Sequence, residues 1–298
     1  MGDKWTAWEQ VKGYGLDFEE VIYEKKYHAE LEGAVARVTV NRPKKYNAFT
    51  NKTMDEMFKA FYEASSDPLV GIVVLTGAGD HFGTGGDIEW EVWGLREQFW
   101  WKYAANRLVR LCRKPVLAAV KGYCIGGSHH LAYCCDFTIA ADTAIMGQNG
   151  PRVSSPADGF IMPYLTHVVG AKKAREIWML CRRYTAHEAL EMGLVNKVVP
   201  VEKMDEEIDR WCEEVLLLSP ACVEILKASF DSILDSLPSI GVTGNMLYPN
   251  YLDTPEGREG STAFMERRPT RFWKIRKAEA EKKKEAQEEL MKRFYEKK

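Results

Sequence analysis

The sequence predicts an α/β fold with a mostly parallel β-sheet. Two short, continuous apolar runs, Gly71–Thr76 and Val116–Val120, are typical of strands buried on both faces. Each run leads into a glycine-rich loop, and the second loop, Gly122–Ser128, passes directly into a helix-like segment. Repetition of strand, glycine loop and helix indicates right-handed βαβ units, in which neighbouring strands run parallel.

The first strand expected in this series is Ala34–Asn41, where apolar and polar residues alternate with a period of two until Arg42 and Pro43 stop the run. Thr50 then occupies an N-cap position ahead of apolar residues at helical spacing. After the two buried strands, a helix-like segment is expected at His129–Cys135 and a third strand at Phe137–Ala140.

Beyond Gly170 the pattern becomes mainly helical, with one short strand expected at Val195–Val199. Four segments carry apolar residues at i, i+3 and i+4, namely Ala171–Cys181, Ala186–Met192, Val201–Leu218 and Pro220–Leu234. The last stretch, Lys277–Lys298, consists mostly of Lys, Glu and Ala. It is typical of a solvated terminal helix or a frayed tail, and packing on a neighbouring subunit is the alternative.

Composition excludes several classes of protein. The chain has 298 residues, of which 46% are apolar and 28% charged, so neither wholesale disorder nor a disulfide-stapled miniprotein is expected. Lys and Arg number 41 against 43 Asp and Glu, which removes any overall electrostatic case for binding nucleic acid or an anionic membrane. No apolar run approaches the ~20 residues of a membrane span, and the first residues lack a signal peptide's apolar stretch, so we expect a cytoplasmic protein.

Seven cysteines give no sign of a disulfide framework or a metal site. Their number is odd, none lies in a CxxC motif, and none has a histidine at metal-ligand spacing. We therefore expect reduced core thiols and no metal ion. They are Cys112, Cys124, Cys134, Cys135, Cys181, Cys212 and Cys222.

Two glycine loops are candidate sites for a ligand oxygen. Gly83–Asp87 follows the first buried strand, and Gly126–Ser128 leads from the second into a helix whose N-terminal N–H groups add positive potential. Glycine lets a backbone N–H approach a ligand closely because no side chain intervenes. Such loops also occur without function. Neither loop has the Gly-Lys-Ser/Thr end of a Walker A motif or the GxGxxG dinucleotide fingerprint.

The order of motifs along the chain resembles that of the crotonase superfamily of acyl-CoA enzymes, from about Asp17 to Trp273. The motifs that carry the resemblance are Arg42-Pro43-x-x-x-Asn47-Ala48-Phe49, Leu75-Thr76-Gly77, Gly85-Gly86-Asp87, Lys114-Pro115-Val116, Gly122-Tyr123, Gly126-Gly127, Cys135-Asp136, Gly147-Gln148 and Ala189-x-x-x-Gly193-Leu194-Val195. The resemblance implies a ββα spiral core over residues 1–200, a C-terminal helical trimerisation region over 201–276 and a charged helical tail over 277–298. It also implies a homotrimer or homohexamer.

The same resemblance implies a site for a coenzyme A thioester, with the coenzyme entering as part of the substrate and no permanently bound cofactor. By matching motifs, the peptide N–H groups of Gly86 and Gly127 are expected to hold the thioester oxygen. Negative charge develops on that oxygen, and losing one such donor typically costs ~10²–10³ in rate. Residues matching the adenine and pantetheine path are Lys45, Ala48, Gly85, Asp87 and Ile88.

The chemistry expected within the superfamily is set by two departures from the enoyl-CoA hydratases. Those enzymes carry two glutamates that hold the added water, where this chain has His130 and Gly150. The segments Gly147–Ser155, Gly170–Tyr184 and Met192–Asn196 instead resemble the dihydroxynaphthoyl-CoA synthases and the ring-opening oxocyclohexanecarbonyl-CoA hydrolases. Gln148, Gly150 and Trp178 resemble a bicarbonate pocket, which the synthases use as base; the same three occur in the ring-opening relatives.

Further catalytic candidates come from the same subgroup resemblance. Ser155 begins a loop in which the acidic residue, Asp158, is displaced by one place, so either the loop bulges and the acid still enters the site or the acid is lost. Tyr251 matches the subgroup's catalytic tyrosine; a packed surface tyrosine is the alternative. His130 is a candidate base toward water or a helix histidine bonded to backbone, and His129 is expected to point away by ~100°.

The aromatic-rich segment Ile88–Tyr103 suits a bulky alicyclic acyl group, with Trp90 and Trp93 as candidate pocket walls. We expect a hydrolase that opens the ring of an alicyclic, mono- or bicyclic, β-oxoacyl-CoA. The alternatives are a dihydroxynaphthoyl-CoA synthase using bicarbonate, a hydratase of a cyclic enoyl-CoA, and an inactive acyl-CoA-binding subunit.

Overall fold

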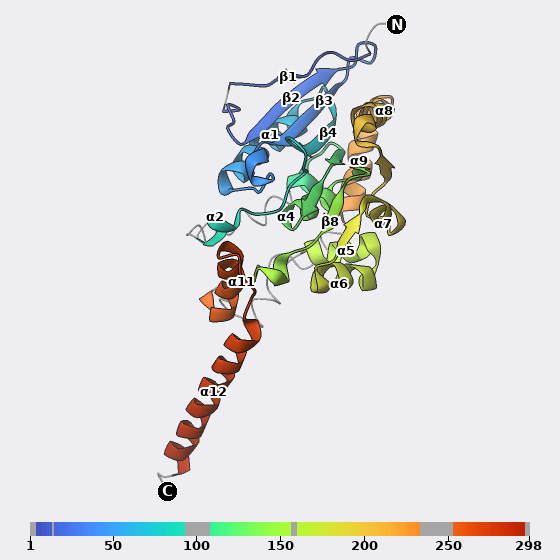
Figure 1. The fold of residues 1–298 in the computed structure, drawn as a ribbon. Helices are drawn as coiled ribbons and strands as arrows, with labels where there is room; N and C mark the ends of the chain where they lie inside the picture. Colours follow the sequence, from blue (N-terminus) through green and yellow to red (C-terminus); the bar gives the residue numbers. More distant parts are fainter. Residues whose placement is uncertain (1–3, 14, 93–107, 156–159, 233–252, 296–298) are drawn as a thin grey trace. The chain divides into compact units, whose positions relative to one another are not determined.

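The structure is a computed structural model that describes residues 4–13, 15–92, 108–155, 160–232 and 253–295. Contacts within the chain divide it into two compact units. One comprises Met1–Gln148 with Asp158–Ile240, and the other comprises Asn149–Ala157 with Gly241–Lys298. The predicted α/β class is confirmed, because a central sheet with flanking helices forms the first unit (Figure 1).

The central sheet contains seven strands in the order β1-β2-β3-β4-β5-β7-β10. Its strands are β1 (Glu9–Gln10), β2 (Val21–Tyr27), β3 (Ala34–Val40), β4 (Val70–Gly77), β5 (Val116–Val120), β7 (Phe137–Ala141) and β10 (Lys197–Val199). The pairings from β3 to β10 are parallel, whereas β1 pairs antiparallel to β2 and β2 pairs antiparallel to β3. The predicted parallel sheet is therefore present, and its five predicted strands agree with β3, β4, β5, β7 and β10 to within a few residues.

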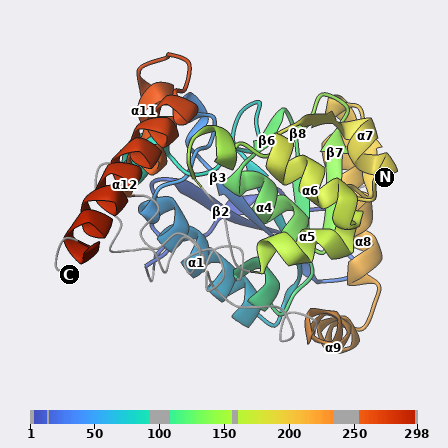
Figure 2. The same ribbon diagram turned by 90° about the horizontal axis from the view of Figure 1, so that it is seen from below.

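Alternating residues of the central strands lie on opposite faces of the sheet. Ile72 and Val74 of β4 belong to one buried cluster with Leu117 of β5 and residues of helix α8 (Met204–Leu216). Successive side chains of a strand point to opposite faces, so the intervening residues, such as Val73, face away from α8. Helices α1 (Asn51–Ser66) and α4 (Gly127–Cys134) also contact the sheet (Figure 2).

Helix α1 begins where the sequence predicts it. Thr50 is the N-cap, and its Oγ1 accepts a hydrogen bond from the N–H of Thr53 while the Thr53 Oγ1 accepts one from the N–H of Thr50. This reciprocal pair satisfies two N–H groups that the first helical turn leaves without partners. Met54, Met57 and Phe61 then bury one face of the helix.

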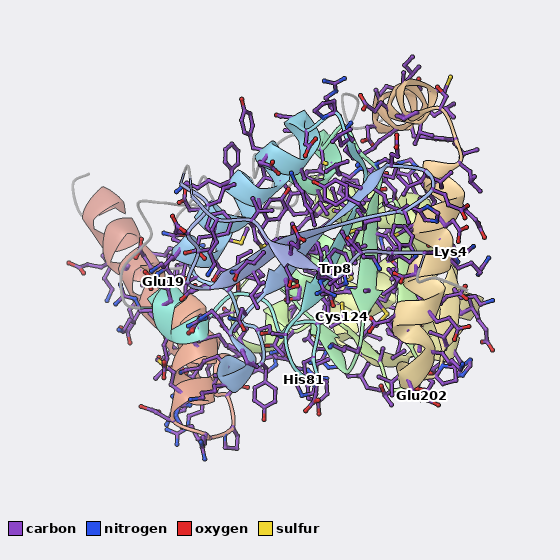
Figure 3. The ribbon with its side chains drawn as sticks, turned by 90° about the horizontal axis from the view of Figure 1, so that it is seen from above. Lys4, Trp8, Glu19, His81, Cys124 and Glu202 are labelled. Atoms are coloured by element: carbon purple, nitrogen blue, oxygen red, sulfur yellow. The ribbon has the colours of Figure 1, made fainter. Side chains whose placement is uncertain are left out.

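Strand β2 is absent from the sequence prediction because its middle is charged. Lys25 and Lys26 are nevertheless only 7% and 4% exposed. Lys25 Nζ lies 2.5 Å from an oxygen of Asp67, and Lys26 pairs with Asp209 of α8. The ring centroid of Trp8 lies 4.7 Å from Lys26 Nζ, and Trp8 lies over this part of the sheet (Figure 3). Ion pairs and aromatic cover thus allow both lysines to be buried.

A second, three-stranded sheet carries the loops that matter for the site. It consists of β6 (Tyr123–Ile125), β8 (Ile145–Gly147) and β9 (Arg183–Thr185). β6 pairs parallel to β8, and β8 pairs antiparallel to β9. β6 leads directly into the Gly126–Gly127 turn, and β8 leads directly to Gln148. From the sequence, β6 is expected to be part of a loop, and neither β8 nor β9 is predicted.

The remaining helices of the first unit follow the predicted helical region. They are α2 (Ile88–Val92), α5 (Ile161–Val169), α6 (Ala171–Leu180), α7 (Ala186–Glu191) and α9 (Pro220–Asp231), with short 3-10 turns at Pro43–Lys45 and Val201–Lys203. Only α5 was not predicted. Of the helices in the described ranges, none has the length and apolar character needed to cross a membrane.

The second unit contains a 3-10 turn at Gly150–Arg152 and helices α11 (Pro255–Met265) and α12 (Phe272–Tyr295). Ser154 connects the turn to α11, because its Oγ donates to the carbonyl of Glu256 and accepts from the N–H of Gly260. The charged tail is part of α12, and its described side chains from residue 277 to 289 are exposed. The domain boundaries expected at residues 200 and 276 remain predictions.

Candidate active site

The two glycine loops lie against each other, backbone to backbone. Cys124 forms a parallel bridge with Gly83, and the N–H of Ile125 donates to the Gly83 carbonyl at 3.0 Å. Gly85 has a φ of +91°, and a Cβ added there would lie 2.7 Å from the amide nitrogen of Gly127. Only glycine fits at this position, because both the backbone conformation and the close approach exclude a side chain.

The N–H groups of Gly86 and Gly127 are left out of the local backbone pairing for two different reasons. Phe49 donates its N–H to the carbonyl of Gly85 and accepts the N–H of Asp87, each at 2.9 Å. In a parallel bridge of this kind the intervening residue, Gly86, points its own N–H away from the partner segment. Gly127 is the first residue of α4, so its N–H has no acceptor within the helix and lies at the positive end of the helix dipole.

Two side chains hold this arrangement in place. The Oγ of Ser128, which is 3% exposed, accepts the N–H of Gly85 at 2.9 Å. The ring of Phe49 fills the space beside Gly127, where an added Cβ would lie 2.5 Å from Cζ. Ser128 was not predicted as a site residue, although a polar residue directly after the Gly126-Gly127 pair is a signal that could have indicated it.

The segment before α1 supports the first glycine loop from the other side. Asn47, in the left-handed region with a φ of 54°, donates from Nδ2 to the carbonyls of Ala78 and His81 at 2.8 and 2.7 Å. Arg42 Nη1 lies 3.0 Å from Asp87 Oδ2. The carboxylate of Asp87, a residue expected on the coenzyme A path, is therefore engaged in an ion pair that holds the loop. Arg42 and Asn47 belong to the motifs that carry the family resemblance, but the sequence alone predicts no role for either side chain.

A buried amide joins two histidines of α4. Gln148 Oε1 lies 3.2 Å from His130 Nε2, and Gln148 Nε2 lies 2.8 Å from His129 Nδ1. His129, expected to point away from His130 by ~100°, nevertheless contacts the same amide as His130. Successive helix residues diverge by ~100°, but the Gln148 amide lies between the two rings and is reached by both. All three side chains are buried, with His129 fully inaccessible.

The surroundings of His129 disfavour a charge on its ring. Burial lowers the pKa of His129 to about 3, and the charges of His130 and Arg183 act in the same direction. The ring of His130 also contacts Trp178 of α6, with centroids 4.9 Å apart. The indole Nε1 of Trp178 is buried, and no acceptor for it occurs in the part of the chain that the structure describes. The predicted residues His130, Gln148 and Trp178 are thus in one cluster.

Comparison with known proteins identifies the family. A sequence profile described as enoyl-CoA hydratase/isomerase matches residues 30–275. This chain belongs to the enoyl-CoA hydratase/isomerase family. Similar solved structures include an enoyl-CoA hydratase/carnitine racemase from Magnetospirillum magneticum, with 30% identity over 86% of this chain and 96% of that one and a TM-score of 0.68. An enoyl-CoA hydratase/isomerase from Xanthobacter autotrophicus Py2 has 30% identity over 74% of this chain and 81% of that one and a TM-score of 0.65.

A third member of the enoyl-CoA hydratase/isomerase family, an enoyl-CoA hydratase from Mycobacterium avium subsp. paratuberculosis, has a TM-score of 0.72. Its identity is 25%, and the match covers 86% of this chain and 99% of that one. The predicted crotonase fold is therefore confirmed, since profile and structures agree on it. The narrower resemblance to synthases and ring-opening hydrolases remains a prediction.

The other residues expected along the coenzyme A path lie next to the first glycine loop of this family member. Lys45 is exposed and its Nζ lies 3.0 Å from Glu89 Oε2, which raises the pKa of the lysine. The carbonyl of Ala48 accepts a hydrogen bond from Arg42. Ile88 begins α2 and is partly buried. Trp90, a predicted pocket wall, is partly buried on the same helix.

Several predicted residues cannot be placed beside these groups. Gly150 and Ser155 lie in the second unit, where the N–H of Ser155 donates to the carbonyl of Gly150 at 3.0 Å. Trp93, Asp158 and Tyr251 lie outside the described residues. The roles predicted for all five stay predictions.

Six of the seven cysteines have the environment of core residues, as predicted, and the prediction is wrong for Cys222. All seven are free, six are buried, and Cys222 is exposed on α9. Burial raises the pKa of Cys134 to about 12 and moves the pKa of Cys124 and Cys135 well above its usual range. These three thiols stay protonated at neutral pH and are poor nucleophiles.

Proposed function

We propose that the protein binds an acyl-CoA thioester and holds its carbonyl oxygen between the N–H groups of Gly86 and Gly127. Support comes from family membership and from the contact between the two loops, in which Gly85 lies against the Gly127 nitrogen. Paired backbone donors stabilise the negative charge of an enolate without reorganising during the reaction. Coenzyme A enters and leaves with the acyl group.

We further propose that the reaction opens the ring of an alicyclic β-oxoacyl-CoA. The observation that carries this proposal is the histidine at position 130, which lies three residues after Gly127 and packs against Trp178 and Gln148. The resemblance assigns a glutamate to this position in the hydratases. An imidazole, with an ordinary pKa near 6.5, can take a proton from water at neutral pH.

In the proposed reaction, water gives a proton to His130 or Asp158 and its oxygen attacks the ring ketone. Ser155 and Tyr251 donate hydrogen bonds to the ketone oxygen. The bond between the former ketone carbon and the thioester's α-carbon then breaks, and its electron pair forms the enolate held by the two glycine amides. The base returns its proton to the α-carbon. The product is a dicarboxylic acid mono-CoA ester, heavier than the substrate by one water.

The synthase alternative requires a bicarbonate ion beside Gln148 and Trp178. The Trp178 Nε1–H, buried without an acceptor among the described residues, favours it as a donor to such an ion. The synthase alternative is disfavoured because the side-chain carbonyl oxygen of Gln148 already contacts His130 and its amide nitrogen already contacts His129. We therefore rank ring closure below ring opening.

Hydration of a cyclic enoyl-CoA is the second alternative, with His130 in place of the glutamate. It is favoured by the similar solved structures, which are named as enoyl-CoA hydratases. An inactive acyl-CoA-binding subunit is the non-enzymatic alternative.

One set of assays separates these functions. The protein is incubated with 2-oxocyclohexanecarbonyl-CoA and its bicyclic homologues. Ring opening predicts loss of the β-oxoester enolate absorbance and a mass gain of one water. Turnover of succinylbenzoyl-CoA, or water addition to a cyclic enoyl-CoA alone, would replace the proposal with synthase or hydratase activity. Binding of all thioesters without turnover would indicate the inactive subunit.

Variants then separate the two candidate bases. We expect His130→Gln to lower kcat by ~10²–10⁴, the usual contribution of a general base, with little effect on thioester binding. His187→Asn, at an exposed position on α7, is the matched control and keeps full activity. Full activity of His130→Gln together with an inactive Asp158→Asn would transfer the role to Asp158.

A further inference from the structure

His129 is the most unusual buried group that the proposed reaction does not use. It is fully inaccessible, and its Nε2 has no hydrogen-bond partner among the described residues. An unpaired buried polar atom costs about 1–3 kcal/mol, so a purely structural role at this position would be better served by an apolar residue. Within the described part of the chain, its ring makes one polar contact, between Nδ1 and the Gln148 amide.

This contact determines where protons lie in the cluster. Gln148 Nε2 is a donor, so His129 Nδ1, 2.8 Å away, must accept and the His129 proton lies on Nε2. The other end of the same amide is its carbonyl oxygen, which can only accept. His130 Nε2, 3.2 Å from that oxygen, must therefore carry a proton. A neutral imidazole has one N–H and one lone pair, which leaves the lone pair of His130 on Nδ1.

We propose that His129 and Gln148 are positioning residues that hold His130 in its Nε2–H tautomer, with Nδ1 as the basic nitrogen. The inference rests on the proposed role of His130 as the base. His129 fixes the direction of the Gln148 amide, and the amide fixes both the ring orientation and the tautomer of His130. Arg183 supports the same residue, since its guanidinium donates to the main-chain carbonyl of Gln148.

The described groups near His130 are themselves uncharged. On its own helix they are His129, whose pKa burial lowers, and Tyr133, whose pKa burial raises well above its usual range. From the other elements they are Gln148 after β8 and Trp178 on α6.

The tautomer is measured directly, without turnover. Nitrogen-15 spectra of the histidine-labelled protein distinguish protonated from unprotonated ring nitrogens, and the signals missing from His130→Gln assign residue 130. We expect a protonated Nε2 and an unprotonated Nδ1 in the wild type at neutral pH. A proton on Nδ1, or a rapidly exchanging mixture of tautomers, would overturn the proposal. His187→Asn should leave the His130 signals unchanged.

Kinetics of Gln148 variants test the positioning role. Gln148→Met retains the length but removes the amide. We expect a fall in kcat of about tenfold to a hundredfold with little change in KM, which is a part of the ~10²–10⁴ that a general base contributes. Gln148→Glu retains an acceptor for His130 and adds a negative charge, so the acidic limb of the pH profile should move to higher pH. Unchanged tautomer and pH profile in both variants would contradict the positioning role.

These results also separate the inference from the proposed function. If His130→Gln remained fully active while the wild type showed the Nε2–H tautomer, the assignment of His130 as base would fail and the proton arrangement would stand. If His130→Gln were inactive while the wild type showed the Nδ1–H tautomer, the base would stand and the positioning proposal would fail.

Discussion

At the scale of single residues, the proposed oxyanion donors are backbone groups whose direction is set by neighbouring side chains. Gly86 and Gly127 have no side chain, so a ligand oxygen can approach their backbone closely. The absence of a side chain does not itself set the direction of the N–H groups. Ser128 and Phe49 do this, through the hydrogen bond to Gly85 and the ring beside Gly127. The sequence predicted the donors through their motifs. It could not predict the supporting contacts, because these join residues far apart in the chain.

We expect Ser128→Ala to loosen the first glycine loop. The Gly85 N–H loses a buried acceptor, which typically costs about 1–3 kcal/mol of unfolding free energy. We also expect kcat/KM to fall by about tenfold, since the adjacent Gly86 N–H is no longer held in direction. Denaturant unfolding and steady-state kinetics measure the two effects. Ser229→Ala, at an exposed helical position, should change neither, and an unchanged Ser128→Ala variant would refute the proposed support.

The buried His129 should make the fold sensitive to acid. Its pKa is about 3 in the folded protein against 6.5 in the unfolded chain, so only the unfolded chain takes up a proton between these values. The contribution of neutral His129 to the free energy of unfolding is complete above pH 6.5 and is lost as the pH falls toward 3. The full loss is about 1.4 kcal/mol for each unit by which the two pKa values differ.

Unfolding free energies of the wild type and His129→Asn, measured from pH 7 to pH 4, test this. The asparagine does not titrate, so the stability of the variant should fall less steeply with acid. His187→Asn should follow the wild type. Parallel curves for the wild type and His129→Asn would show that His129 is not held neutral.

At the scale of helices and strands, the elements with a clear local pattern were predictable, and several others were not. β4 and β5 are continuous apolar runs, and α1 has both an N-cap residue and apolar residues at helical spacing. The local sequence is therefore enough to define these elements. β6, β8 and β9 have three residues each, too few for a period to be visible. β2 was missed for another reason, since Lys25 and Lys26 are buried through ion pairs with distant residues.

The cap of α1 gives a test at this scale. Thr50→Ala removes the acceptor of the Thr53 N–H and also the bond from Thr50 Oγ1 to Glu20 Oε2, which is 2.6 Å long. We expect a loss of about 1–2 kcal/mol, at the upper part of the range for N-cap threonines. Thermal or denaturant unfolding measures it. The matched variant Thr143→Ala, at an exposed position, should stay within about 0.5 kcal/mol of the wild type. An equal loss of stability in both variants would show that the N-cap of Thr50 does not stabilise the helix specifically.

At the scale of the whole molecule, the site of the first unit gathers segments from most of its length. Strands β3 and β4 end at the segment around Asn47 and at the first glycine loop, while β6 and β8 end at the second loop and Gln148. The order of motifs predicted the family and which segments participate. It did not predict that both histidines share one amide, because that contact depends on how the small sheet places β8 beside α4.

The most direct test is a crystal structure of the protein with a bound acyl-CoA thioester. The account predicts that the thioester oxygen lies roughly 2.7–3.1 Å from the amide nitrogens of both Gly86 and Gly127, the separation at which such donors stabilise developing charge. A thioester bound with its oxygen away from either nitrogen, or the two amides directed into different cavities, would contradict it.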